Sequence, residues 1–418
     1  MKRRFGFWQL VFAVLIVGLT PVWTPAQEVR LGALQDTTGA TSDVGKGEAV
    51  GVRAAVQYYN DKGGINGKPI KLFQYDYGYK IPEAITTYKR FKDVDKVVMI
   101  LGWGTPDTEG LAPTITVDKM PYLTSSFSAH LCDPKKTPYN FVYGSDYSTN
   151  ARGAITYWYE EVWKKDPKWK ALREKGAKPK LVPFIATASP YATAPLKALK
   201  DQAALLGFEV GPDQDVPLTA VDTKSQVLRA KDFGANLGWH GNTVMSVSAT
   251  LKDAYALKLG ADFILNPWGF DENLPRLAGP AAEGAIGLIA CALFHDEYPA
   301  KKIVHEYALK IDPNTSLDKR HVREVQGWVK VTLAVEAMKK ADKAGQLNGP
   351  GIKDAFETFR NWPGLKDFGG QLVTITPTDH RYTPVVRVGR IVKGKPVTVG
   401  EIDMKQKYAD KWDSWLGW

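Results

Sequence analysis

The chain has 418 residues, of which 44% are hydrophobic and 24% are charged. This composition belongs to a globular protein long enough for two domains, and it excludes a disordered or collagen-like chain. The net charge of +10 comes from basic residues scattered among acids and aromatics, without the clustered stripe typical of a nucleic-acid-binding surface. We therefore expect no nucleic-acid partner.

Residues 1–26 differ from the rest. Lys2, Arg3 and Arg4 precede an apolar run, and Thr24 and Ala26 are small residues at the positions that a signal peptidase reads. The pattern predicts a cleaved signal peptide over 1–26, whose loss lowers the net charge from +10 to +7 because it carries three basic and no acidic residues. The alternative is a membrane anchor, but the apolar run is shorter than the ~20 residues of a spanning helix.

Two cysteines, Cys132 and Cys291, follow this segment. Export would place them in a compartment that permits disulfides. A disulfide between them and two buried free thiols remain open alternatives, because sequence separation says nothing about distance in the fold.

The chain after the signal alternates between strand and helix patterns. Strands are expected at 28–36, 70–76, 97–102, 120–126, 180–187, 208–218 with a loop, 242–248 and 261–268. Helices are expected at 48–61, 82–94, 108–119, 151–165, 191–207, 250–260 and 322–341. This order predicts an α/β protein with doubly wound parallel sheets.

Ligands of such sheets bind beyond the carboxyl ends of the strands, where loops meet helix N-termini. Four loops in these places are rich in small and hydroxyl residues, namely 35–45, 102–110, 124–131 and 187–193. We expect the binding site there.

The opening of the chain carries a family resemblance. Thr38-Gly39, Gly45 and an alanine-rich helix ending in "YYNDKGGINGK" resemble the start of type I periplasmic solute-binding proteins of the leucine/isoleucine/valine-binding family. These proteins supply ABC importers of the branched-chain amino acid type. The resemblance covers nearly all of residues 28–400.

The resemblance implies two doubly wound lobes joined by three crossovers, with the ligand in the cleft between them. Lobe 1 would be 28–145 plus 292–366, and lobe 2 would be 146–291 plus 367–418. It also implies a periplasmic monomer that binds a small carboxylate and delivers it to the membrane permease of an ABC importer. A ligand-sensing domain that reports to a receptor is the alternative.

The family's loops assign contacts residue by residue. Thr105 matches the hydroxyl residue that binds the ligand carboxylate, aided by the positive end of a helix dipole; its alternative role is a helix N-cap. Ser126 and Ser128 match further ligand contacts, or else they satisfy turn backbone only. Tyr191 matches an aromatic residue that reaches the ligand from lobe 2, with buried packing as its alternative.

The sequence departs from the amino-acid binders of the family at one charge. Trp268 stands where they have an acid that neutralises the ligand's α-ammonium. An ammonium buried without a counter-charge would be unfavourable by several kcal/mol. Either Asp271 takes this role, or the ligand has no α-ammonium.

Other wall residues also differ. Val44 replaces a common Tyr or Trp and leaves room, while Trp103 and Phe127 add aromatic surface that suits a flat or apolar acid. A ligand cation over Trp268 is the competing idea, and each tryptophan could instead belong to the core.

Nothing in the sequence predicts an enzyme. It has no G-x-S-x-G, Walker or H-E-x-x-H motif, and "GWG" lacks the spacing of a dinucleotide loop. The histidines show no pair four residues apart, as a helical metal site would have. His130 with Cys132 is a nearby pair of the kind that is usually structural. We expect no catalytic residue, metal or cofactor.

Overall fold

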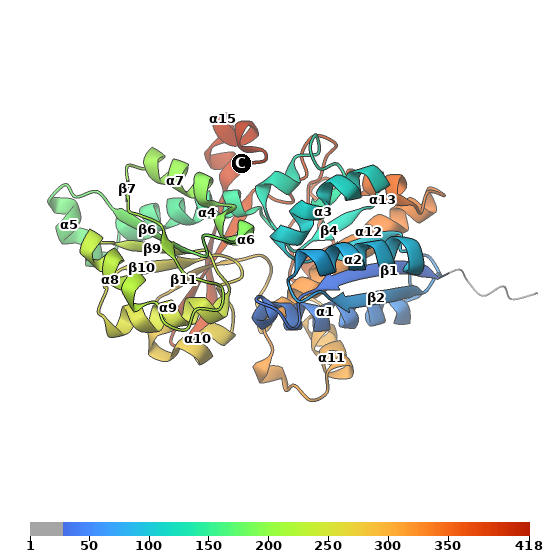
Figure 1. Cartoon of the computed structure of the whole chain (residues 1–418), viewed down its shortest axis with the longest axis horizontal. Helices are drawn as coiled ribbons and strands as arrows, with labels where there is room; N and C mark the ends of the chain where they lie inside the picture. The colour runs from blue at the N-terminus through green and yellow to red at the C-terminus, as the bar shows by residue number, and fades with distance from the viewer. Residues whose placement is uncertain (1–27) are drawn as a thin grey trace, which may run out of the picture.

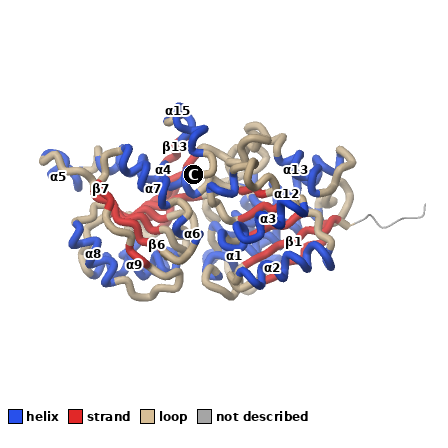
Figure 2. The backbone as a smooth tube through the Cα atoms, turned by 45° about the horizontal axis from the view of Figure 1, so that its top comes forward, coloured by secondary structure: helices blue, strands red, loops and turns tan. Residues whose placement is uncertain are grey.

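The computed structural model describes residues 28–418, so the predicted signal peptide lies outside the described residues. The described chain forms two lobes, each built around its own sheet (Figure 1). Helices lie around the strands of both lobes (Figure 2). In residues 28–418, no helix combines the length and the apolar character needed to cross a membrane.

The first lobe holds a parallel sheet with the strand order β2-β1-β3-β4-β5. Its strands are β1 (Val29–Gln35), β2 (Ile70–Asp76), β3 (Met99–Gly102), β4 (Tyr122–Thr124) and β5 (Asn140–Val142). Its helices are α1 (Ser42–Asp61), α2 (Ile81–Arg90), α3 (Thr105–Asp118), α11 (Lys301–Ile311), α12 (Val322–Lys343) and α13 (Gly349–Phe356).

The second lobe holds a sheet with the order β13-β12-β11-β10-β9-β6-β7, and β8 also pairs with β6. Its strands are β6 (Lys180–Ile185), β7 (Glu209–Val210), β8 (Gln214–Asp215), β9 (Leu237–His240), β10 (Asp262–Leu265), β11 (Ile286–Ile289), β12 (Val385–Val392) and β13 (Lys395–Asp403). The pairs β11–β12 and β12–β13 are antiparallel, and the other strand pairs of this sheet are parallel.

The helices of the second lobe are mostly short. They are α4 (Tyr147–Tyr157), α5 (Lys170–Glu174), α6 (Pro190–Thr193), α7 (Leu196–Leu205), α8 (Lys224–Phe233), α9 (Val244–Ala256), α10 (Asn273–Ala278), α14 (Met404–Lys407) and α15 (Ala409–Trp412).

The chain passes between the lobes three times, after β5, after β11 and before β12. This confirms the predicted two-lobed α/β fold with three crossovers. The residues at which we divide the lobes, 145, 291 and 366, stay a prediction.

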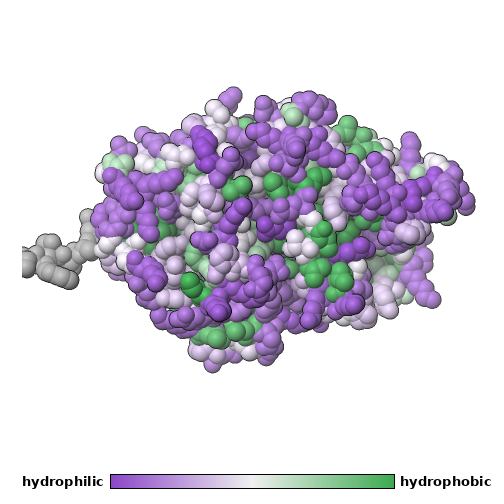
Figure 3. Space-filling view, turned by 180° about the vertical axis from the view of Figure 1, so that it is seen from behind, coloured by the Kyte–Doolittle hydropathy of each residue, from purple (hydrophilic) through white to green (hydrophobic). Residues whose placement is uncertain are grey.

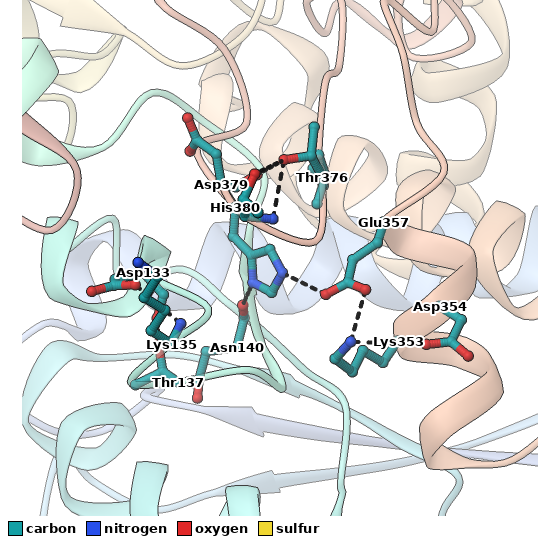
Figure 4. Close-up of polar contacts among 12 residues, drawn as sticks. Asp133, Lys135, Thr137, Asn140, Lys353, Asp354, Glu357, Thr376, Asp379 and His380 are labelled. Atoms are coloured by element: carbon teal, nitrogen blue, oxygen red, sulfur yellow. Dashed lines mark hydrogen bonds and ion pairs between the residues drawn. The ribbon is translucent and has the colours of Figure 1, made fainter. Parts of the chain in front are cut away.

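A buried histidine fastens the third crossover to the first lobe (Figure 4). His380 Nδ1 lies 2.9 Å from the Asn140 carbonyl oxygen, which can only accept, so this nitrogen carries a proton. Its Nε2 lies 3.0 Å from the Glu357 carboxylate. Burial raises the pKa of Glu357, but hydrogen bonds from His380 and Lys353 outweigh it and hold the pKa below its ordinary value.

One predicted element is wrong. Residues 242–248 were expected to form a strand, but α9 begins at Val244, and the strand is β9, just before it. The β-branched residues favoured a strand on local propensity. Val244, Val247 and Leu251 are buried on one side of the helix at the spacing i, i+3, i+7, so packing decides for the helix.

Cys132 and Cys291 are both buried free thiols. The alternative of a disulfide between them is thereby excluded. Burial raises the pKa of both thiols, which keeps them protonated.

The face of the molecule in Figure 3 is largely hydrophilic, and its hydrophobic residues gather in several separate groups.

A pair of oppositely charged side chains is buried in the core of the first lobe. Glu48 on α1 and Lys330 on α12 are fully buried, and Lys330 Nζ lies 2.8 Å from the Glu48 carboxylate. Lys330 also donates to the Gly102 carbonyl and to Ser125 Oγ. The pair therefore ties two packed helices to the ends of β3 and β4.

Lys330→Met should strongly destabilise the protein, because it leaves the Glu48 carboxylate buried without a counter-charge. The expected loss in the free energy of unfolding is about 3–5 kcal/mol, measured by urea denaturation. The double variant Glu48→Leu with Lys330→Met should lose less. Lys340→Met, further along α12 and half-exposed, is the matched control. A loss below about 1 kcal/mol for Lys330→Met would contradict the account.

Candidate functional site

A buried cavity lies between the lobes, at the carboxyl ends of their strands. Seven lining residues come from loops and helix starts of the first lobe: Thr41, Val44, Tyr79, Trp103, Gly104, Thr105 and Ser125. Four come from the second lobe: Tyr147, Tyr191, Thr243 and Trp268. None of these eleven side chains is acidic or basic. Apart from Val44 and Gly104, the lining residues thus carry aromatic rings or hydroxyl groups.

Aromatic rings close the cavity across the lobes. The ring centroids of Trp103 and Trp268 are 5.3 Å apart in an edge-to-face contact. Phe127 stacks near Trp268 at 5.7 Å, and Tyr147 lies 5.7 Å from Tyr191. The cavity volume is about 20 Å³, which is room for roughly one water molecule. A larger solute therefore enters only when these rings move apart.

Thr105 is the first residue of α3, and its N–H has no acceptor within the helix. Gly104 occupies the N-cap position, so the alternative of Thr105 as the N-cap is wrong. The Thr105 hydroxyl oxygen lies 2.6 Å from Ser126 Oγ. Thr105 as a whole is buried, with 1% of its surface exposed. A negative group beside Thr105 would meet an unused N–H and the positive end of α3.

Gly102 and Gly104 of this loop are each required as glycine for a different structural reason. A Cβ on Gly102 would lie 1.8 Å from the Tyr122 ring, so this glycine serves core packing. A Cβ on Gly104 would lie 2.5 Å from atoms of Tyr79 and Asp107. Gly104 therefore lets the cavity wall close around the start of α3.

The three serines of loop 124–131 have their hydroxyl groups bonded inside the protein. Ser125 Oγ donates to Glu48 at 2.7 Å and accepts from Lys330 at 2.7 Å. Ser126 supports Thr105, and Ser128 Oγ donates to Glu109 at 3.0 Å. Ser126 and Ser128 do not line the cavity. Phe127 does not line it either, but its ring packs against the lining residue Trp268.

The second lobe presents Trp268 on a tightly bonded turn after β10. The Asn266 side chain accepts from the Trp268 N–H at 2.7 Å and from the Gly269 N–H at 3.1 Å. The Trp268 indole N–H donates to Tyr147 Oη at 2.8 Å. Asn266 and the Tyr191 hydroxyl are also bonded to each other. The aromatic walls of the second lobe thus form one bonded unit.

Asp271 does not reach the cavity. Its buried carboxylate lies 3.3 Å from the Arg323 guanidinium, and it also accepts from the Asn273 N–H at 2.8 Å. The guanidinium lies 5.1 Å from the centre of the Trp268 ring. The cation near Trp268 is therefore the protein's own, and the acid suggested as a counter-charge for a ligand is already paired.

Two other carboxylates join the lobes at helix N-termini. Asp43, in the first turn of α1, accepts from the Met245 N–H of α9 at 3.1 Å. Glu272, in the second lobe, accepts from the Val322 N–H of α12 at 2.9 Å. Burial raises the pKa of Asp43 to about 6 and that of Glu272 to about 7.

Asp107 lies close beneath the cavity, within the first turn of α3. It accepts a hydrogen bond from the Tyr77 hydroxyl. Burial raises the pKa of Asp107 to about 7, so part of its population is neutral near that pH. In residues 28–418, no group of three or more His, Cys, Asp and Glu side chains has a metal-binding arrangement.

The structure brings together five of the nine predicted site residues as cavity lining: Val44, Trp103, Thr105, Tyr191 and Trp268. Ser126, Phe127, Ser128 and Asp271 lie behind this lining. That any of the nine contacts a ligand stays a prediction.

Six lining residues were not among the predicted nine: Thr41, Tyr79, Gly104, Ser125, Tyr147 and Thr243. Thr41, Gly104 and Ser125 lie in loops that were expected to form the site, and Tyr79 follows β2, where the rule that sites follow strand ends could have found it. Tyr147 begins α4 just past the first crossover. Thr243 was hidden by the wrong strand at 242–248, since it is the N-cap residue of α9.

Comparison with known proteins shows what the chain resembles. The model of the periplasmic binding protein family matches residues 28–396. No curated protein matches the chain in sequence. Many solved structures share the fold.

Three of these structures are informative. An ABC transporter substrate-binding protein from Aeropyrum pernix is 28% identical, with 91% of this chain and 96% of that chain covered and a TM-score of 0.78. A branched-chain amino acid ABC transporter protein from Thermus thermophilus, with bound valine, is 21% identical, with 92% and 100% covered and a TM-score of 0.81. A solute-binding protein of an ABC transporter from Rhodopseudomonas palustris BisB5, in complex with 3,4-dihydroxybenzoic acid, is 18% identical, with 90% and 98% covered and a TM-score of 0.71.

The family model spans most of the chain, and the two lobes with a cavity between them are the architecture of its members. The chain is a solute-binding protein rather than an enzyme, and it belongs to the periplasmic binding protein family.

Proposed function

We propose that the protein is the periplasmic component of a branched-chain amino acid type ABC importer and that it captures a small apolar or aromatic acid without an α-ammonium. The observation that carries this proposal is the lining of the cavity, which combines the start of α3 with aromatic rings and contains no acidic side chain.

A carboxylate has a favourable place in such a cavity. The N-terminus of α3 offers the Thr105 N–H and the positive end of the helix dipole. The Thr105 hydroxyl can turn from Ser126 to donate to an anion, and bonds to charged groups are about twice as strong as neutral ones. This supports a ligand with one negative end.

An α-ammonium has no such place. Asp271 is paired with Arg323, and Asp43 and Glu272 are bonded to backbone N–H groups between the lobes. Asp107, beneath the cavity, accepts from the Tyr77 hydroxyl, and burial raises its pKa to about 7, so it is partly neutral near that pH. A buried ammonium would then lack a full counter-charge, which is unfavourable. The rings of Trp103 and Trp268 instead offer an apolar surface for the rest of the ligand.

Two of the named relatives were solved with different kinds of acid. One was solved with bound valine and another with 3,4-dihydroxybenzoic acid. At these identities the similarity shows the fold alone, so the choice between an amino acid and an acid without an amine rests on the cavity of this chain.

Closure would link binding to transport. Contacts that a solute makes with both lobes exist only when the lobes are closed, so binding shifts the population toward the closed form. We propose that this form, exported to the periplasm by the segment 1–26, is recognised by the membrane permease.

A matched set of acids tests the ligand class. 3-Phenylpropanoate or 4-methylpentanoate should raise the melting temperature of the purified protein, because a ligand that binds only the folded state stabilises it. Phenylalanine and leucine, which add an α-ammonium to these carbon skeletons, should raise it much less. A shift with leucine and none with any acid that lacks an amine would contradict the proposal.

Thr105→Val tests the carboxylate site. Loss of the hydroxyl should weaken the binding of an acid by about 1–3 kcal/mol, or roughly 5- to 150-fold, as measured by isothermal titration. Thr116→Val is the matched control, because Thr116 lies on the same helix and bonds only to the Ala112 carbonyl. Equal affinities for all three proteins would remove Thr105 from the site.

Affinity should depend on pH through the carboxylates between the lobes. Burial in the closed form raises the pKa of Glu272 to about 7, so the closed form binds this proton more tightly than the open form does. Closure is then favoured below pH 7 and weakened above it.

The affinity for a bound acid should therefore rise roughly 10-fold from pH 8 to pH 6. Glu272→Gln should remove most of this rise, while Asp43→Asn, whose carboxyl group titrates lower, should remove less. Titrations at a series of pH values measure it. An affinity that falls over this window would show that the sign is wrong.

A further inference from the structure

The loop that carries Trp268 is held from two sides. Its own lobe holds it through the Asn266 side chain, which bonds the N–H groups of Trp268 and Gly269. The other lobe holds it through Arg323, the second residue of α12. Arg323 is 1% exposed, so its guanidinium is sealed between the lobes.

The planar guanidinium group of Arg323 donates hydrogen bonds to the backbone of this loop. One terminal nitrogen donates to the Pro267 carbonyl at 2.8 Å and to Gln326 at 2.9 Å. The other donates to the Phe270 carbonyl at 3.1 Å and to the Asp271 carboxylate at 3.3 Å. The residues bonded in the loop lie on both sides of Trp268 in sequence.

The same guanidinium lies 5.1 Å from the centre of the Trp268 ring, within the range of a cation–π contact. Arg323 thus fixes the backbone before and after Trp268 and also contacts its side chain. A lysine could supply the charge but not the fork, because a single ammonium cannot bond both carbonyls and the carboxylate in this planar arrangement.

We propose that Arg323 is a positioning residue that sets the place of Trp268 in the cavity wall from the opposite lobe and thereby determines which solute fits. This inference rests on the proposed function in taking the cavity to be the solute-binding site. Because Arg323 belongs to the first lobe and Trp268 to the second, opening the cleft breaks these contacts. The contacts from Arg323 therefore act on Trp268 only when the lobes are closed, in addition to the bonds within its own lobe.

The pairing with Asp271 gives Arg323 a second effect on specificity. A charge buried without a partner would be unfavourable, and the guanidinium removes the acid that could otherwise attract an amine. Arg323 therefore supplies both features that distinguish this cavity, an ordered tryptophan and a neutralised aspartate.

Fluorine NMR on protein labelled with 5-fluorotryptophan tests the proposal without any ligand. The Trp268 signal is assigned by its loss in Trp268→Phe. In Arg323→Lys and Arg323→Met this signal should shift or broaden, since the indole loses its support. Arg323→Lys keeps the charge and remains informative if Arg323→Met does not fold.

Arg276→Lys is the matched control. Arg276 also joins the lobes, donating to the Asp318 carbonyl at 3.0 Å and the Lys319 carbonyl at 3.1 Å, but no contact joins it to Trp268 among the described residues. Its Trp268 signal should match that of the unaltered protein. An unchanged signal in the folded Arg323 variants, or an equal change in Arg276→Lys, would overturn the proposal.

A second arm separates this inference from the proposed function. Titration with 3-phenylpropanoate should shift the Trp268 signal in the unaltered protein. The affinity of Arg323→Lys for 3-phenylpropanoate should be at least several-fold lower. If no acid of the matched set binds, the proposed function fails, while the ligand-free spectra still decide the role of Arg323.

Discussion

The contact between Trp103 and Trp268 across the cleft is the interaction on which the site depends. Each ring stands at the carboxyl end of a strand in a different lobe, and the two centroids are 5.3 Å apart. Because each indole N–H is bonded within its own lobe, to Thr41 and Tyr147, the rings meet through their apolar surfaces. Closing the lobes therefore builds an apolar cavity, and separating them removes it.

Charge around this cavity is organised so that little of it remains for a ligand. Lys330 is paired with Glu48 beneath the floor, and Arg323 is paired with Asp271 behind Trp268. What stays available is the helix N-terminus at Thr105, which attracts negative charge. On the proposed function, the apolar walls and this one positive end together favour an acid over an amino acid.

The sequence predicted the fold well because strand and helix patterns alternate strongly and the first loop resembles a known family. It failed at 242–248, where β-branched residues suit both a strand and a buried helix, and this error hid Thr243. Thr105 and Trp268 were assigned to the cleft by the family resemblance, and both also lie after predicted strands. Arg323 could not be predicted, since its partners in the Trp268 loop lie more than fifty residues away and only tertiary packing brings them together. The same holds for the pairing that commits Asp271.

Native mass spectrometry of the protein purified from its native cells tests the central claim most directly, because it identifies the solute that the protein retains between its lobes. The account predicts a small apolar or aromatic acid whose mass and fragments show a carboxyl group and no α-amine. Retention of leucine, valine or another amino acid would contradict it.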